Sequence, residues 1–208
     1  AAVNAVSLYT QGQGATFRDV HVAGARNVAE AATAAGITRL VHVSGIGADA
    51  GHPDAYVAAR GEGERTVREA APEAAILRPS ALVGPQDALL AGIDLLTHRL
   101  PVVPLFGDGR MRLQPLHVED AAEAVARALE DEHAPGRTLE VGGRDVVTYR
   151  GLVEAVCAHR GRRRLLLPVP FGLWSLAAEL LRVLPEPPLT RHQLGLARMD
   201  NVVARESD

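Results

Sequence analysis

Short apolar runs alternate with helix-like stretches along the first part of the chain. The runs lie at residues 2–6, 39–45 and 74–77, and apolar positions recur at helical spacing at 20–35 and 56–70. Gly36 follows the first helix-like stretch as a helix-ending residue would. Strands that alternate with helices build a parallel sheet with helices on its faces. The sequence therefore predicts an α/β fold with a doubly wound parallel sheet.

Polar side chains or a proline close the three predicted strands. Ser7 and Ser44 end the first two strands, and Arg78 and Pro79 end the third. In parallel sheets, ligands bind beyond the carboxyl ends of the strands. We therefore expect these residues to converge on one rim and to line a single cleft.

A serine, a tyrosine and an arginine stand close together after the second strand. Tyr56 comes twelve positions after Ser44, and Arg60 comes four positions after Tyr56 in the same helix-like stretch. Residues four apart share one face of a helix. The Arg60 guanidinium would then lie beside the Tyr56 phenol and favour its ionised form. A hydroxyl, a phenol and a cation in this setting resemble a dehydrogenase site.

Each of these residues also has a plainer interpretation. Ser44 can be an ordinary strand-end serine, Tyr56 a half-buried tyrosine, and Arg60 a surface residue of its helix. Arg78 can pair with an acid beneath the loop instead of facing the cleft, and the two interpretations have equal weight. The residues alone leave these alternatives open.

The pattern changes after Pro79. Residues 102–106 and 111–116 are strand-like, and a Gly107-Asp108-Gly109 turn joins them, so we expect a β-hairpin. We divide the chain into a sheet domain at residues 1–86 and a mixed segment at 87–208, with a small lobe and a tail that frays. Further helices are expected at 88–99, from Glu119 to Pro135, from an N-cap at Thr148 through Cys157, and at 171–184, with strands at 138–141 and 165–167.

Charge and composition argue against several classes of protein. A net charge of −3 does not favour nucleic-acid binding, which needs a concentrated basic face. The single cysteine, Cys157, excludes an internal disulfide and is expected to be buried in a reducing compartment. The eight histidines show no metal-ligand spacing, so no metal site is expected. No apolar run approaches the roughly 20 residues that span a bilayer, so we expect a cytoplasmic protein, either soluble or peripheral to a membrane.

Two features of the second half each have two interpretations. In residues 171–184 only Ser175, Glu179 and Arg182 are polar, and they share one face, which leaves a wide apolar stripe. The stripe packs on the small lobe, or it docks a protein partner or a membrane surface. The four arginines within residues 160–164 form either a solvated turn at a helix end or a site for an anionic lipid or a 2′-phosphate.

An ordered set of motifs, at residues 3–7, 20–28, 41–44, 56–60, 77–79 with 83–85, and 117–120, runs through the chain. In that order it resembles the extended and atypical short-chain dehydrogenase/reductases, which include epimerases and dehydratases. Within them it is similar to the branch of the nucleotide-binding accessory subunit of respiratory complex I. The resemblance implies that residues 1–86 are part of a Rossmann-type NAD(P)-binding domain and that a small α/β carboxyl-terminal lobe follows. It also implies NAD or NADP as cofactor and a small molecule as substrate.

The resemblance assigns roles to individual residues. In the family the serine polarises a carbonyl, the tyrosine is the general acid or base, and a lysine four residues later holds the nicotinamide ribose. It implies Ser44, Tyr56 and Arg60 as catalytic residues. Arg60 stands in place of the lysine, and a guanidinium is effectively never deprotonated, so it cannot join a proton relay. The residues implied for cofactor binding are Ser7, Tyr56, Arg60, Arg78 and Pro79.

Two classes of function remain open at this point. The first is an NAD(P)-dependent oxidoreductase or epimerase-like enzyme, which the presence of Ser44 and Tyr56 favours. The second is a non-catalytic nucleotide-binding structural module of a respiratory or membrane-associated complex, which Arg60 favours. His21, where many extended members carry Asn, is a second departure from the catalytic pattern.

The glycine-rich turn that binds a dinucleotide pyrophosphate is expected upstream of Ala1. Gly12 and Gly14 follow a predicted strand, but no third glycine opens the next helix. We therefore expect this chain to be the carboxyl-terminal part of a longer protein, with the strand at residues 2–6 in the middle of the sheet.

We predict that the 208-residue chain alone binds NAD(H) or NADP(H) weakly, because none of its glycines forms the expected pyrophosphate turn. Calorimetric titration measures this directly. Tight, stoichiometric binding by the isolated chain would show that these residues suffice for the cofactor.

Overall fold

A computed structural model describes residues 1–11, 14–85, 87–181 and 191–204, and the chain forms two compact units. Unit 1 comprises Ala1–Ser80, Leu116–Gly142 and Val203–Asp208, and unit 2 comprises Ala81–Pro115 and Gly143–Val202. The boundary predicted at residue 86 thus lies near the first crossing between the units. The segment at 116–142 belongs to unit 1 again. The predicted division into two consecutive domains has no place for a segment of this kind.

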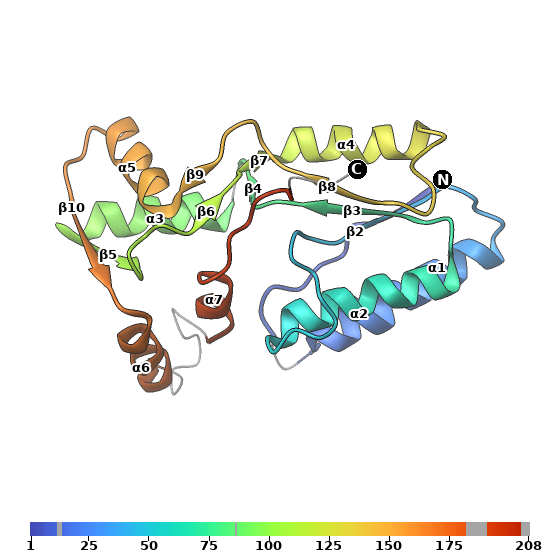
Figure 1. Cartoon of the computed structure of the whole chain (residues 1–208), viewed down its shortest axis with the longest axis horizontal. Helices are drawn as coiled ribbons and strands as arrows, with labels where there is room; N and C mark the ends of the chain where they lie inside the picture. The colour runs from blue at the N-terminus through green and yellow to red at the C-terminus, as the bar shows by residue number, and fades with distance from the viewer. Residues whose placement is uncertain (12–13, 86, 182–190, 205–208) are drawn as a thin grey trace. The chain divides into compact units, whose positions relative to one another are not determined.

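Unit 1 is built on a parallel sheet, as the alternation of strands and helices predicts (Figure 1). The strand order is β1-β2-β3-β8, and each neighbouring pair is parallel. The strands are β1 (Ala2–Asn4), β2 (Leu40–Val43), β3 (Ala75–Pro79) and β8 (Thr138–Val141). The other elements are a π-helix, η1 (Arg18–Gly24), the helices α1 (Ala25–Ala34), α2 (Ala55–Ala70) and α4 (Val118–Glu130), and the short strand β7 (Leu116–His117).

Helices cover both faces of this sheet. Leu40 of β2 packs with the α1 alanines and with Val67 of α2 on one face. The next residue, Val41, packs with Leu77 and with Ala128 of α4 on the other face. Successive side chains of a strand point to opposite faces, so one strand contributes to two cores. Figure 1 shows α1 and α2 on one side of the sheet and α4 on the other. The doubly wound fold is confirmed.

Two glycines let α2 approach its neighbours closely. A Cβ added to Gly63 would lie 2.0 Å from the carbonyl oxygen of His21 in η1. A Cβ added to Gly61 would lie 2.2 Å from the backbone nitrogen of Ala50. Side-chain atoms do not fit at such distances, so any other residue at either position would push α2 away.

Unit 2 contains a second core, around Ile93, Val103, Leu105, Val153 and the free, buried Cys157. Its elements are β4 (Leu82–Val83), α3 (Ala88–Arg99), β5 (Val102–Phe106), β6 (Arg112–Leu113), β9 (Val147–Thr148), α5 (Tyr149–His159), β10 (Leu165–Val169), α6 (Phe171–Leu181) and α7 (Arg191–Leu196). The hydroxyl of Thr148 accepts a hydrogen bond of 3.0 Å from the Gly151 nitrogen, so the predicted N-cap of α5 is confirmed.

The predicted hairpin at Gly107–Gly109 is wrong. β5 pairs in parallel with β10, and β6 pairs antiparallel with β9. The turn itself exists: Gly109 donates to the Phe106 carbonyl at 3.0 Å, and both glycines have positive φ. A distant strand of five residues supplies a longer ladder for β5 than the two residues of β6 can. The residues of the turn alone do not indicate that β6 and β10 compete to pair with β5.

Helix α6 packs on the end of β5 through one side only. The Trp174 indole nitrogen donates to the Leu105 carbonyl at 3.0 Å, and the Trp174 ring lies 4.8 Å from the Phe106 ring. Ala178 is buried with Leu194 of α7. The predicted helix at 171–184 is described as far as Leu181, and its last three positions lie outside the described residues. In the part of the chain that the structure describes, no helix is long and apolar enough to cross a bilayer.

We predict that Trp174→Ala lowers the free energy of unfolding of unit 2 by about 2 to 4 kcal/mol, because it removes a large ring from the α6 contact. Leu173→Ala, at an exposed position of the same helix, is the matched control and should change it by less than about 0.5 kcal/mol. Urea denaturation of both variants measures the difference. Equal effects would contradict the one-sided packing of α6.

Candidate functional site

The end of β2 and the start of α2 bring the predicted site residues together in unit 1. Asp54 caps α2, and its carboxylate accepts from the backbone nitrogens of Tyr56 at 3.0 Å and Val57 at 3.2 Å. The cap places Tyr56 in the first turn of the helix and Arg60 one turn later. Ser44 immediately follows β2, and its nitrogen donates to the Leu77 carbonyl at 2.7 Å.

Arg60 connects the helix to the strand end. One of its terminal nitrogens donates to the Tyr56 hydroxyl and the other donates to the Ser44 carbonyl oxygen. Gly45 makes room for this fork, since a Cβ at Gly45 would lie 3.2 Å from the central guanidinium carbon. The structure thus joins all three predicted catalytic residues in one hydrogen-bonded unit.

Aromatic rings enclose the Tyr56 side chain, which is only 5% exposed. The rings of Phe17 and His21 meet it edge-on, each with centroids 5.3 Å away, and the Tyr9 ring lies 5.8 Å away. Ser7 forms a side-chain hydrogen bond with Tyr56. The sequence indicated Ser7 and Tyr56 but not Tyr9 or Phe17, whose contacts arise from the close approach of α2 to η1.

Burial raises the pKa of Tyr56 to about 12, although the charge and hydrogen bond of Arg60 and the hydrogen bond of Ser7 act to lower it. The sequence predicts that Arg60 favours the phenolate, and this contribution is present. Desolvation of the phenolate is the larger effect, because rings surround the side chain. Tyr56 is therefore a neutral phenol at physiological pH.

Two buried histidines, His21 and His42, lie beside this group. Sequence reasoning noted His21 as a departure from the catalytic pattern of the family and did not single out His42. His42 of β2 faces Asn4 of β1, with 3.1 Å between the His42 Nδ1 and the Asn4 amide nitrogen. The His21 Nε2 lies 3.0 Å from the Leu8 carbonyl oxygen. Burial, with Arg60 and His21 adding repulsion, lowers the pKa of His42 to about 4. Burial also lowers the pKa of His21. The sequence does offer one indication for His42, because it is a polar residue inside the apolar run at 39–45.

Arg78 forms a partly buried ion pair with Glu64 and holds the loop after Ser44. Its guanidinium donates to both Glu64 oxygens, at 2.9 and 2.7 Å, and to the Ala48 carbonyl at 3.2 Å. A second carboxylate, that of Glu140, has one oxygen 3.8 Å from a terminal nitrogen of Arg78. The pairing with an acid, one of the two sequence interpretations, is thus present. The carbonyl of the neighbouring Pro79 accepts from the Ile46 nitrogen at 3.1 Å, so both residues shape the loop.

Two polar atoms of the site are buried without a hydrogen-bond partner among the described residues: the Ser44 hydroxyl and the Arg60 Nε. Buried polar groups normally have partners, so an orphan pair at one site fits a ligand with hydroxyl or carbonyl oxygens. The ribose and carboxamide of a nicotinamide nucleotide carry such groups. In the described part of the chain, no group of three His, Cys, Asp or Glu side chains is placed to hold a metal ion.

Comparisons with known proteins identify the family and the fold. The family model described as "NAD dependent epimerase/dehydratase family" matches residues 1–142. The chain is 30% identical over 196 residues to the NADH-ubiquinone oxidoreductase 40 kDa subunit of Neurospora crassa, covering 92% of this chain and 50% of that protein. It is 42% identical over 106 residues to the ceramide reductase of Caulobacter vibrioides, covering 51% of this chain and 33% of the reductase. The chain thus spans half or less of the length of these relatives.

A solved structure with the same fold is the UDP-glucuronic acid 4-epimerase of Bacillus cereus in complex with NAD. The TM-score is 0.67 at 17% identity, over 81% of this chain and 62% of the epimerase. An identity this low supports the fold and not the reaction.

We predict that acid destabilises unit 1 through His42. The folded pKa is about 4 and the unfolded value is near 6.5, so the unfolded chain binds a proton first as the pH falls. This part of the stability is complete above about pH 6.5 and is lost as the pH falls towards 4. Between pH 7.5 and pH 5 it amounts to about 2 kcal/mol. His21 acts in the same direction.

Urea denaturation of the natural chain and of His42→Gln at the two pH values measures this effect. The variant should lose about 2 kcal/mol less stability on acidification. The exposed His159→Gln is the control and should behave like the natural chain. An unchanged pH dependence in His42→Gln would contradict the assignment.

Proposed function

Because this chain belongs to the NAD dependent epimerase/dehydratase family, we propose that it binds NAD(H) or NADP(H) at the carboxyl end of its parallel sheet. Ser44, Tyr56 and Arg60 would hold the nicotinamide end of the dinucleotide. The orphan Ser44 hydroxyl and Arg60 Nε support this role, since both can bond oxygens of a ligand. Ser7 contributes through its bond to Tyr56, and Arg78 and Pro79 keep the loop after Ser44 in place.

We further propose that the site binds the dinucleotide without turning it over, and that the bound cofactor stabilises a structural module. The observation that carries this proposal is the Arg60 fork on a buried phenol whose pKa is about 12. A general acid or base works best when its pKa is near the operating pH. The phenol is far from that range, and the guanidinium that replaces the family's lysine cannot release a proton.

A module of this kind needs a larger assembly. The Neurospora crassa relative is named as a subunit of an NADH-ubiquinone oxidoreductase, and its match extends over 92% of this chain. We propose by analogy that this protein acts in the cytoplasm as a component of a respiratory or membrane-associated complex, with a protein partner.

A second candidate is an NAD(P)-dependent reductase or epimerase-like enzyme. The specific observation in its favour is the Ser44 hydroxyl, which is buried beside the Tyr56–Arg60 pair and has no partner among the described residues. In this case Ser44 would orient a substrate carbonyl and Tyr56 would donate its proton to the oxygen as hydride reaches the carbon. The ceramide reductase similarity supports this alternative.

Arg60 separates the two candidates. In the complete gene product, Arg60→Ala should weaken cofactor binding about tenfold or more, because it removes charge-assisted hydrogen bonds. Arg60→Lys should retain binding and create no turnover. Arg65→Ala, on the exposed side of the same helix, is the matched control and should bind normally. Calorimetry measures binding, and nicotinamide absorbance measures hydride transfer to a panel of ketones and nucleotide sugars.

Hydride transfer by the unmodified protein, abolished by Tyr56→Phe while binding persists, would replace the module with the enzyme. Failure of the complete gene product to bind either dinucleotide would refute both candidates.

A further inference from the structure

Three leucines of α6 are exposed to solvent. Leu173, Leu176 and Leu180 are each between 58% and 67% exposed, and their spacing of three and four residues puts them on one side of the helix. Trp174 and Ala178 face the other way, into the contact with β5 and α7. Most amphipathic surface helices show polar residues to water, so this face is unusual for a surface that remains in water.

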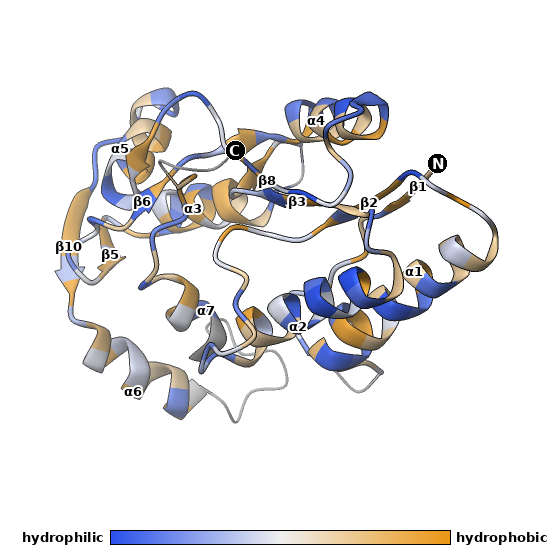
Figure 2. Cartoon of the chain, turned by 45° about the vertical axis from the view of Figure 1, so that its right-hand side comes forward, coloured by the Kyte–Doolittle hydropathy of each residue, from blue (hydrophilic) through white to orange (hydrophobic). Residues whose placement is uncertain are grey.

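The two-stranded sheet that precedes α6 also has an apolar outer face. Val102 pairs with Leu165, and Pro104 pairs with Leu167, in the parallel register of β5 and β10. Val102, Leu165 and Leu167 are 39%, 65% and 49% exposed, whereas Val103 and Leu105 on the inner face are buried. Figure 2 shows most of β10 in the hydrophobic colour. The α6 leucines and this outer face, called here the leucine surface, both belong to unit 2.

Unit 2 is cationic although the whole chain is acidic. It holds twelve arginines and eight acidic residues, a net charge of +4, whereas the chain as a whole carries −3. Unit 1 therefore carries −7. Four acids of unit 2, at positions 94, 108, 154 and 200, are already paired with arginines. The charge that remains on this unit is positive.

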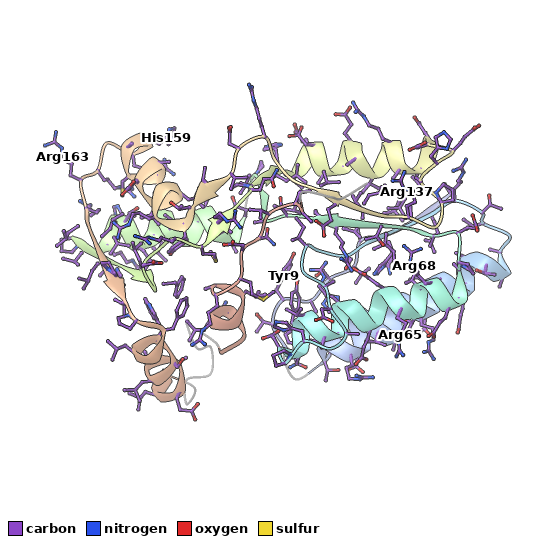
Figure 3. All side chains as sticks on the ribbon, in the orientation of Figure 1. Tyr9, Arg65, Arg68, Arg137, His159 and Arg163 are labelled. Carbon is purple, nitrogen blue, oxygen red and sulfur yellow. The ribbon has the colours of Figure 1, made fainter. Side chains whose placement is uncertain are left out.

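Three exposed arginines near the leucine surface have no carboxylate partner among the described residues. Arg99 precedes β5 and Arg163 precedes β10. Figure 3 shows the Arg163 side chain projecting outwards from unit 2. The Arg198 guanidinium lies 4.8 Å from the centre of the Phe171 ring, in the first turn of α6. Cations therefore stand near the first residues of β5 and β10 and near the first turn of α6.

We propose that the leucine surface docks on a phospholipid bilayer that contains anionic lipids. Aliphatic side chains enter the boundary between headgroups and acyl chains, while arginines beside them reach the lipid phosphates. Each cation near an anionic membrane surface contributes about 1 kcal/mol to binding. A second copy of unit 2 would bring like charges together. A nucleic acid would match the charge but gains nothing from the leucines.

This docking is independent of the proposed dinucleotide site, because the residues proposed for that site all belong to unit 1. It concerns adsorption on a membrane surface, which needs no membrane-spanning helix.

Vesicle sedimentation of the complete gene product tests the proposal. Vesicles of phosphatidylcholine with about 30 mol% phosphatidylglycerol should retain the protein, and vesicles of phosphatidylcholine alone should retain at least tenfold less. The triple variant Leu173→Ser/Leu176→Ser/Leu180→Ser should lose more than tenfold of the binding, because it removes the inserting side chains. Val118→Ser/Val146→Ser removes exposed apolar side chains elsewhere and should bind normally.

The charge is tested in the same assay. Arg99→Gln, Arg163→Gln and Arg198→Gln should each reduce binding to the anionic vesicles about fivefold. Arg26→Gln, an exposed arginine of unit 1, should not. Thermal unfolding of every variant identifies any that fail to fold, and for those Leu→Gln at single positions replaces the serine variants.

Equal binding to neutral and anionic vesicles, or binding that survives the loss of the leucines, would overturn the proposal. So would a dimer in solution that the leucine variants convert to monomer, because the surface would then join two copies of the chain. Capture by an acidic protein in place of vesicles would also overturn it.

Discussion

The close approach of α2 to η1 and to the loop after β2 sets the geometry of unit 1. Gly63 lies against the His21 carbonyl and Gly61 against the Ala50 nitrogen, at distances that no side chain allows. The approach brings the Tyr56 ring onto His21 and Phe17 and places Arg60 within reach of the end of β2. A single Cβ at Gly63 would move the helix, and with it the phenol, the guanidinium and the partly buried pair of Glu64 with Arg78.

The close approach of α2 to η1 also determines the protonation state of Tyr56. A guanidinium beside a phenol would ordinarily stabilise the phenolate, but the rings that surround Tyr56 exclude the water that a phenolate needs. The chain contains no lysine, so all 22 of its cations are guanidinium groups. Arg60 donates hydrogen bonds to Tyr56 and to Ser44 at the same time. The planar guanidinium holds both partners in a fixed geometry, whereas the ammonium group of a lysine would hold them less rigidly. Such a site favours holding a ligand over exchanging protons with it.

The sequence predicted what depends on local pattern and failed where distant segments compete. Alternating runs predicted the parallel sheet, and Thr148 correctly marked the start of α5. The four-residue spacing on a helix was enough to predict that Tyr56 and Arg60 lie side by side. The Gly107 turn suggested a hairpin, because nothing local shows that β10, some sixty residues later, offers β5 a longer partner. The net effect on the Tyr56 phenol was also out of reach, since Tyr9 and Phe17 become its neighbours only when α2 meets η1.

The interleaving of the two units has a consequence for synthesis on the ribosome. The sheet of unit 1 is complete only when β8 has emerged, and by then α3 and β5 of unit 2 are already outside. The partner strand of β5 is β10, so the apolar residues of β5 stay unpaired until residues 165–169 have been synthesised. Contacts between residues so far apart in sequence form slowly. Exposed apolar strands in such a waiting state are open to aggregation. We therefore expect a chaperone to protect the nascent chain most in the interval between the emergence of β5 and that of β10 from the ribosome.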